Sequence, residues 1–111
     1  MAPNDSFIVQ FDWDEHNIGH LALRQLAPVD AEQVILNRPV DLETILRSGE
    51  ERVVQIGETD AETILIVVST MRGEKVRVVT AWPAKERFRR YFLSLKRNGN
   101  VGRTEKQDLR E

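Results

Sequence analysis

The stretch Thr63–Lys96 decides the fold, and it reads TILIVVSTM (63–71), RGE (72–74), KVRVVTAW (75–82) and PAKERFRRYFLSLK (83–96). The first segment is apolar at almost every position, as a strand in the middle of a sheet requires. In the third segment Lys75 and Arg77 alternate with valines, so one face of that strand can carry charge. The short segment centred on Gly73 predicts a hairpin loop between the two strands.

The fourth segment predicts a helix beginning at Pro83, because the first residue of a helix has no intrahelical use for its amide. Its apolar residues recur at helical spacing and form one stripe: Ala84, Phe88, Tyr91, Phe92 and Leu95. Arg87 and Arg89 lie at the margins of this stripe, and Arg90 points further away from it. The helix can therefore pack on the sheet and still present guanidinium groups beside it.

The preceding residues predict further elements of the same domain. The apolar run 7–11 predicts a first strand, and 52–57 predicts a second. Segments 14–25 and 29–36 carry apolar residues at helical spacing and predict two helices. Residues 40–47, VDLETILR, fit strand alternation and helical spacing almost equally well, so they stay unassigned.

Together these elements predict an α+β fold. We expect a small antiparallel four-stranded sheet packed with two N-terminal helices and a C-terminal helix, in the order β-α-α-β-β-β-α. A chain of 111 residues fits one domain, which we expect to span residues 1–96. Residues 97–111 are charged and lack aromatic residues, so they are predicted to be a disordered tail. The pattern leaves open which edge of the sheet 7–11 joins.

Composition excludes several classes of protein. The chain has no cysteine, which rules out disulfides and thiolate chemistry. No apolar run approaches the roughly 18 residues of a membrane span, and the first residues, MAPNDS, lack a secretory signal pattern. The expected location is therefore the cytoplasm, with no membrane partner.

Charge is distributed unevenly along the chain. Residues 1–46 hold eight acids and two bases, whereas 83–111 hold nine bases and four acids. An acidic half followed by a basic end predicts contact with nucleic acid or with a complementary protein surface. The alternative is a solvated helix with a charged tail. The net charge of −2 argues against a strongly basic nucleic-acid-binding protein.

Several short pieces of the sequence, taken in order, are similar to one family. They are FDWDEHN (11–17), the strand 52–57, ILIVVST (64–70), and RVVTA (77–81) leading to RRY (89–91). Over about residues 7–92 the chain resembles BrnT-like proteins. This resemblance implies a RelE-type fold and a toxin-like endoribonuclease that cleaves RNA without a metal or other cofactor. It also implies a cognate antitoxin protein as partner, and a homo-oligomer is possible.

The chain departs from the family pattern at three polar positions. Arg24 stands where many members carry histidine, and Trp82 ends the strand where many carry arginine. Glu86 fits the usual helical glutamate in a shifted register. These departures favour a second hypothesis, a catalytically degenerate member that binds RNA or a protein chain. A third hypothesis is a structural, oligomerising protein.

RNA cleavage needs a base, an acid, and cations that stabilise the developing phosphorane. We expect Arg77 and Arg87 to supply the cations, and Tyr91 or His20 to transfer protons. The alternatives are a solvated surface for the arginines, and for Tyr91 a ring that packs in the apolar stripe. The residues expected to contact RNA are Arg24, Arg52, Lys75, Arg89 and Arg90.

The two histidines and two tryptophans allow alternative roles. His16 and His20 have the spacing of two metal ligands, but a third ligand is lacking and Arg24 on the same helical face repels a cation, so no metal site is predicted. We expect a surface pair, with an RNA or partner contact as the alternative. For Trp13 and Trp82 we expect core packing, with base stacking as the alternative.

Overall fold

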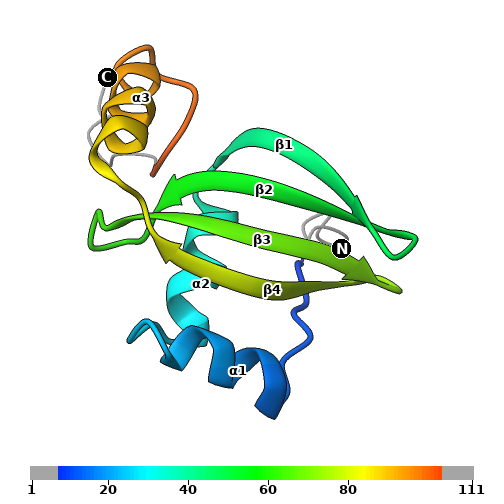
Figure 1. The fold of residues 1–111 in the computed structure, drawn as a ribbon. Helices are drawn as coiled ribbons and strands as arrows, with labels where there is room; N and C mark the ends of the chain where they lie inside the picture. The colour runs from blue at the N-terminus through cyan, green and yellow to red at the C-terminus, as the bar shows by residue number, and fades with distance from the viewer. Residues whose placement is uncertain (1–7, 104–111) are drawn as a thin grey trace, which may run out of the picture.

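The computed structural model describes residues 8–103 and confirms the α+β class. The elements are α1 (Glu15–Ala22), α2 (Pro28–Leu36), β1 (Val40–Arg47), β2 (Glu50–Glu58), β3 (Ile64–Arg72), β4 (Lys75–Pro83) and α3 (Glu86–Lys96). The strands form one antiparallel sheet in the order β1-β2-β3-β4 (Figure 1). Each strand pairs with its neighbour in sequence, as expected for strands joined by short connections.

The predicted element order was wrong at one strand. The observed order is α-α-β-β-β-β-α, and the unassigned residues 40–47 supply the fourth strand by pairing with β2 from Val40↔Ile56 to Arg47↔Glu50. In the segment predicted as the first strand, the described residues 8–11 make a single parallel bridge, Phe11↔Val76, at the outer edge of β4. The chain does not continue along this edge because it turns at Asp14 to begin α1.

Helix α1 begins at Asp14 because the side chains of Asp14 and Asn17 cap it reciprocally. The Asp14 carboxylate accepts hydrogen bonds from the amides of His16 and Asn17, and the Asn17 side chain accepts from the Asp14 amide. Asn17 is buried, and its Nδ2 donates to the Val78 carbonyl at 3.0 Å. The cap therefore also fastens the helix to β4.

Helices α1 and α2 cover one face of the sheet (Figure 1). The core between them consists of small and branched residues: Leu21, Ala31, Val34, Leu65, Val67, Val78 and Ala81. Helix α3 lies against the other face at one end of the sheet. There Phe92, which is fully buried, packs with Ile56, Ile64 and Ile66.

Helix α3 begins later than predicted. Pro83 is the last residue of β4, and the Ala84 amide still donates to the Ile64 carbonyl at 3.0 Å. Because strand pairing continues through Ala84, the first helical residue is Glu86. The apolar stripe still meets the sheet through Phe88 and Phe92.

The described part of the expected tail, residues 97–103, packs against β2. The buried Gly102 donates its amide to the Arg38 carbonyl at 2.9 Å, and the Arg103 amide donates to the Glu58 carboxylate at 2.9 Å. The Glu58 side chain is 1% exposed and also binds Nζ of Lys96 at 2.7 Å. This network fixes the C-terminal end of α3. Residues 104–111 lie outside the described residues.

Two glycines give a matched test of this packing. A Cβ at Gly57 would lie 3.0 Å from Val34 and 3.1 Å from Pro39, whereas a Cβ at Gly19 in α1 meets nothing within 4 Å. Gly57→Ala is expected to lower the free energy of unfolding by about 1–3 kcal/mol through overpacking. Gly19→Ala is expected to raise it by about 0.5–1 kcal/mol, because alanine favours the helix. Urea denaturation measures both, and equal effects would contradict the packing described.

Candidate nucleic-acid interface

The face of the sheet opposite α1 and α2 is the candidate interface, and we call it the open face. Alternation along β2 and β3 places Val54 and Ile66 on it, and with them Arg52. The pair Arg72↔Lys75 places Lys75 on this face, and alternation adds Arg77 and Val79. The register shift after Val68 brings Trp82 onto the same face. In the part of the chain that the structure describes, α3 covers one end of it (Figure 1).

Four cations and Glu50 lie at the end of the open face that carries the hairpin turns. The hairpin-end cluster consists of Arg47, Arg52, Arg72 and Lys75 around Glu50. Glu50 accepts from Nε of Arg52 at 3.1 Å and from Nε of Arg72 at 3.0 Å. The hydrogen bond from Arg52, helped by Arg72, holds the pKa of Glu50 below its ordinary value, so the carboxylate stays charged at neutral pH.

At the other end a groove of about 530 Å³ lies between the sheet and α3, and we call it the α3 groove. Its lining combines apolar, aromatic and charged side chains: Leu42, Glu43, Val54, Ile66, Trp82, Lys85, Arg87 and Phe88. The guanidinium carbon of Arg87 lies 5.0 Å from the centroid of the Phe88 ring. That of Arg24 lies 5.8 Å from the Trp82 ring, and its Nη1 is 3.5 Å from Oγ1 of Thr80. Two guanidinium groups therefore lie against aromatic rings of the groove, and Lys85 adds another cation to its lining.

His20, on α1, lies beside β4. Its Nδ1 is 3.2 Å from the Val79 carbonyl oxygen, and a carbonyl can only accept a hydrogen bond. Nδ1 must therefore carry the proton, and in the neutral ring Nε2 keeps its lone pair. The His16 ring stacks at an angle, with its centroid 4.7 Å away. His20 thus has the tautomer that a general base requires.

Arg77 lies on the predicted face but is not exposed. The residue is 9% exposed, and its two terminal nitrogens bind the two oxygens of Asp14 at 3.1 Å each. Asp12 adds a third contact at 3.5 Å. These carboxylates, Asp14 first, raise the pKa of Arg77, and the Arg77 hydrogen bond lowers the pKa of Asp14. The sequence predicts a charged strand face at Arg77, but there the segment before α1 brings two carboxylates that bind its guanidinium and help to bury it.

The structure separates the residues expected to act in catalysis. Arg87 lines the α3 groove and His20 lies beside β4. Arg77 is held by carboxylates, and Tyr91, which is 45% exposed on α3, does not line the groove.

The expected RNA contacts lie in three places. Arg24 flanks the groove, whereas Arg52 and Lys75 belong to the hairpin-end cluster. Two others, Arg89 and Arg90, form ion pairs with Glu86 at 3.4 and 3.1 Å.

Sequence reasoning missed Lys85, Arg47 and Arg72. Lys85 was placed inside the predicted helix, whereas it precedes α3 and lines the groove. Arg47 lay in the unassigned segment, and reading its alternation as a strand would have paired it with β2. Arg72 was assigned to the loop, although it is the last residue of β3.

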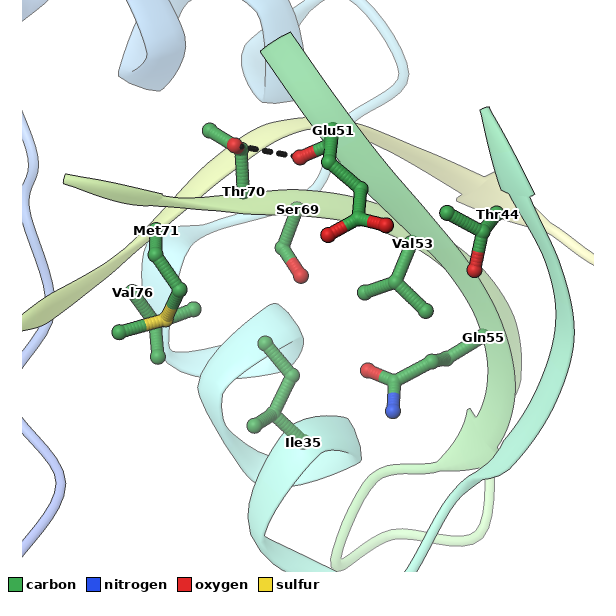
Figure 2. Close-up of a pocket in the computed structure, with 9 residues that line it drawn as sticks. All are labelled: Ile35, Thr44, Glu51, Val53, Gln55, Ser69, Thr70, Met71 and Val76. Atoms are coloured by element: carbon green, nitrogen blue, oxygen red, sulfur yellow. Dashed lines mark hydrogen bonds between the residues drawn. The ribbon is translucent and has the colours of Figure 1, made fainter. Parts of the chain in front are cut away.

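A second cavity lies on the opposite side of the sheet, beside α2, and has a different chemistry. It measures about 360 Å³ and is lined by Ile35, Thr44, Glu51, Val53, Gln55, Ser69, Thr70, Met71 and Val76. Figure 2 shows Ile35 of α2 facing Val53 and Gln55 of the sheet across this space. These lining residues bring one carboxylate and no cation, so an anionic ligand fits the open face better.

Within residues 8–103, no three His, Asp or Glu side chains gather closely enough to hold a metal ion, and no helix is long and apolar enough to cross a membrane. No family model matches the chain, and no curated protein matches its sequence.

The Arg77–Asp14 pair predicts a pH dependence of stability. The folded-state pKa of Asp14 lies below its ordinary value of 3.8, so its contribution is present above that pH and is lost as the pH falls through the folded pKa. Asp14→Asn keeps a capping side chain and removes the charge. The wild type should therefore be more stable than Asp14→Asn at about pH 7, and the difference should shrink below about pH 4.

Chemical denaturation at a series of pH values measures this difference. In an Arg77→Met background the two proteins should differ much less, because the partner cation is gone. If the stability difference between the wild type and Asp14→Asn is unchanged by the Arg77→Met substitution, the assignment of the pKa shift to Arg77 is contradicted.

Proposed function

We propose that the chain binds single-stranded RNA on its open face, with bases and phosphates held in the α3 groove. One observation carries the proposal: Trp82 and Phe88 line the groove together with Lys85 and Arg87, and Arg24 stands against the Trp82 ring. Sites for single strands combine such cations, which contact phosphates, with aromatic rings, on which unpaired bases stack.

The geometry favours a single strand over a duplex. Bases in a duplex are stacked on one another, so an aromatic side chain can reach the face of an unpaired base far more easily. The groove has apolar walls from Leu42 and Ile66, which suit the flat face of a base. The similarity to BrnT-like proteins supports RNA as the nucleic acid.

The arginines supply the stronger phosphate contacts. A guanidinium presents a planar set of five N–H donors that matches a phosphate, and it stays charged at any physiological pH. The rings beside Arg24 and Arg87 hold the two side chains near the groove through cation–π contacts. The lining holds one carboxylate, Glu43, against two cations, Lys85 and Arg87, so its net charge is positive.

Charge removal in the groove tests this proposal. Lys85→Ala and Arg87→Ala remove exposed cations, and each is expected to weaken binding of a labelled oligouridine several-fold, because a phosphate contact is lost. Each should also reduce the slope of log K against log salt by about 0.7. Arg97→Ala is the matched control, since Arg97 is exposed at the C-terminal end of α3 and does not line the groove.

Fluorescence anisotropy over a salt series provides both quantities. Equal loss of affinity in the Arg97→Ala control would show that the general charge of α3, and not the groove, attracts the RNA.

RNA cleavage is a second candidate, favoured by the tautomer of His20. Nε2 of His20 can take the proton of a 2′-hydroxyl, whose oxygen then attacks the adjacent phosphorus as the 5′-oxygen of the next nucleotide leaves. Arg24, four residues after His20 in the chain, would stabilise the charge that develops on the phosphate oxygens. The leaving oxygen takes a proton from water. A toxin-like role, with an antitoxin partner, rests on the similarity to BrnT-like proteins.

This second candidate makes a distinct prediction. Cleavage should yield a 2′,3′-cyclic phosphate and a 5′-hydroxyl, and His20→Gln should lower the rate by at least about 100-fold because it removes the base. Mass spectrometry of the products and gel assays of the rate check both. RNA that stays intact with the wild type, while binding persists, would exclude cleavage and leave the binding function standing.

A further inference from the structure

We infer that the hairpin-end cluster is a second phosphate-binding site for the same RNA strand, so that the open face holds one strand of about six nucleotides by its two ends. The length follows from β4, which runs from Lys75 in the cluster to Trp82 in the α3 groove. Seven residue steps at about 3.3 Å each span about 23 Å. A stacked strand advances about 3.4 Å per nucleotide, so about six or seven nucleotides cover this span. This inference rests on the proposed RNA-binding function.

The hairpin-end cluster is built to present cations in fixed positions. Glu50 holds Nε of Arg52 through one oxygen and Nε and Nη2 of Arg72 through the other. A guanidinium carries five N–H donors, so each arginine keeps donors for a phosphate. The side chains of Arg52 and Arg72 are 27% and 48% exposed, so a ligand can reach them.

Charge balance also favours an anionic ligand at this end. Arg47, Arg52 and Arg72 lie next to Glu50, and Lys75 pairs with Arg72 on β4. Glu74 in the turn adds a second carboxylate, which leaves four cations against two acids. The cluster therefore has an excess of positive charge that its own ion pairs do not neutralise. Such an excess costs self-repulsion in the free protein and is relieved when a phosphate binds.

The middle of the open face lacks this chemistry and separates the two ends. Its floor is apolar, with Ile45, Val54, Val68 and Val79. Near the β4 edge the charge of Arg77 is offset by Asp12 and Asp14, whose carboxylates repel phosphate. The strand should thus be held through phosphates at both ends and cross the middle without charged contacts.

The two-ended arrangement predicts a dependence on RNA length. Joining two sites through one ligand makes the second contact intramolecular, so a six-nucleotide strand gains affinity that a three-nucleotide strand cannot. Oligouridines of three, six and nine nucleotides are the probes, measured by fluorescence anisotropy with the full chain. We expect the six-nucleotide strand to bind at least tenfold more tightly than the three-nucleotide strand, with a smaller gain from six to nine.

The double variant Arg72→Ala/Lys75→Ala tests the cluster itself. It should bring the affinity for six nucleotides close to the affinity for three. Arg90→Ala/Arg97→Ala removes the same charge from α3 and its C-cap, outside the groove, and should keep the length dependence. Lys75→Ala alone leaves the Glu50 ion pairs intact, so its several-fold loss for six nucleotides cannot be attributed to misfolding of the hairpin.

The outcomes separate this inference from the proposed function. If the wild type binds the six-nucleotide strand and both cluster variants bind it equally well, the second site does not exist and the α3 groove alone binds RNA. If the wild type binds no oligouridine of any length, the proposed function itself fails.

Discussion

Asp14 joins the first helix to the edge of the sheet, and the arrangement of the interface depends on this one residue. Its carboxylate caps α1 and at the same time binds both terminal nitrogens of Arg77 on β4. Because α1 starts there, His20 comes to lie at the Val79 carbonyl and Arg24 against Trp82. The same ion pair neutralises Arg77, which is nearly buried on β4 and therefore stabilises the fold. The exposed cations around it remain available to a ligand.

The apolar central strand β3 explains why the two faces differ. Its residues are buried on both sides, so each face needs a cover. Helices α1 and α2 supply it on one side, whereas on the other α3 covers one end. Where that cover ends, the strands carry arginine and lysine in place of valine and isoleucine. A surface with an apolar middle and basic ends is the result.

The sequence predicted the fold class because its strong patterns are local. The double-sided apolar run of β3, the alternation in β4 and the amphipathic α3 each indicate an element without knowledge of its neighbours. Residues 40–47 were undecidable, because the alternation of an edge strand such as β1 resembles helical spacing over eight residues. The site was harder to predict. The burial of Arg77 depends on Asp12 and Asp14, more than 60 residues away in sequence, and the groove depends on where α3 begins after Pro83.

The central claim is that the open face, and not the helix-covered face, binds a single RNA strand. The most direct measurement is a titration of the ¹⁵N-labelled chain with a six-nucleotide RNA, followed by the amide chemical shifts. We predict that the largest shifts occur at Trp82, Lys85 and Arg87 and at the hairpin-end cluster, while Ile35 and Gln55, which line the cavity beside α2, stay unchanged. Shifts confined to α2 and its cavity, or no shifts at all, would contradict the account.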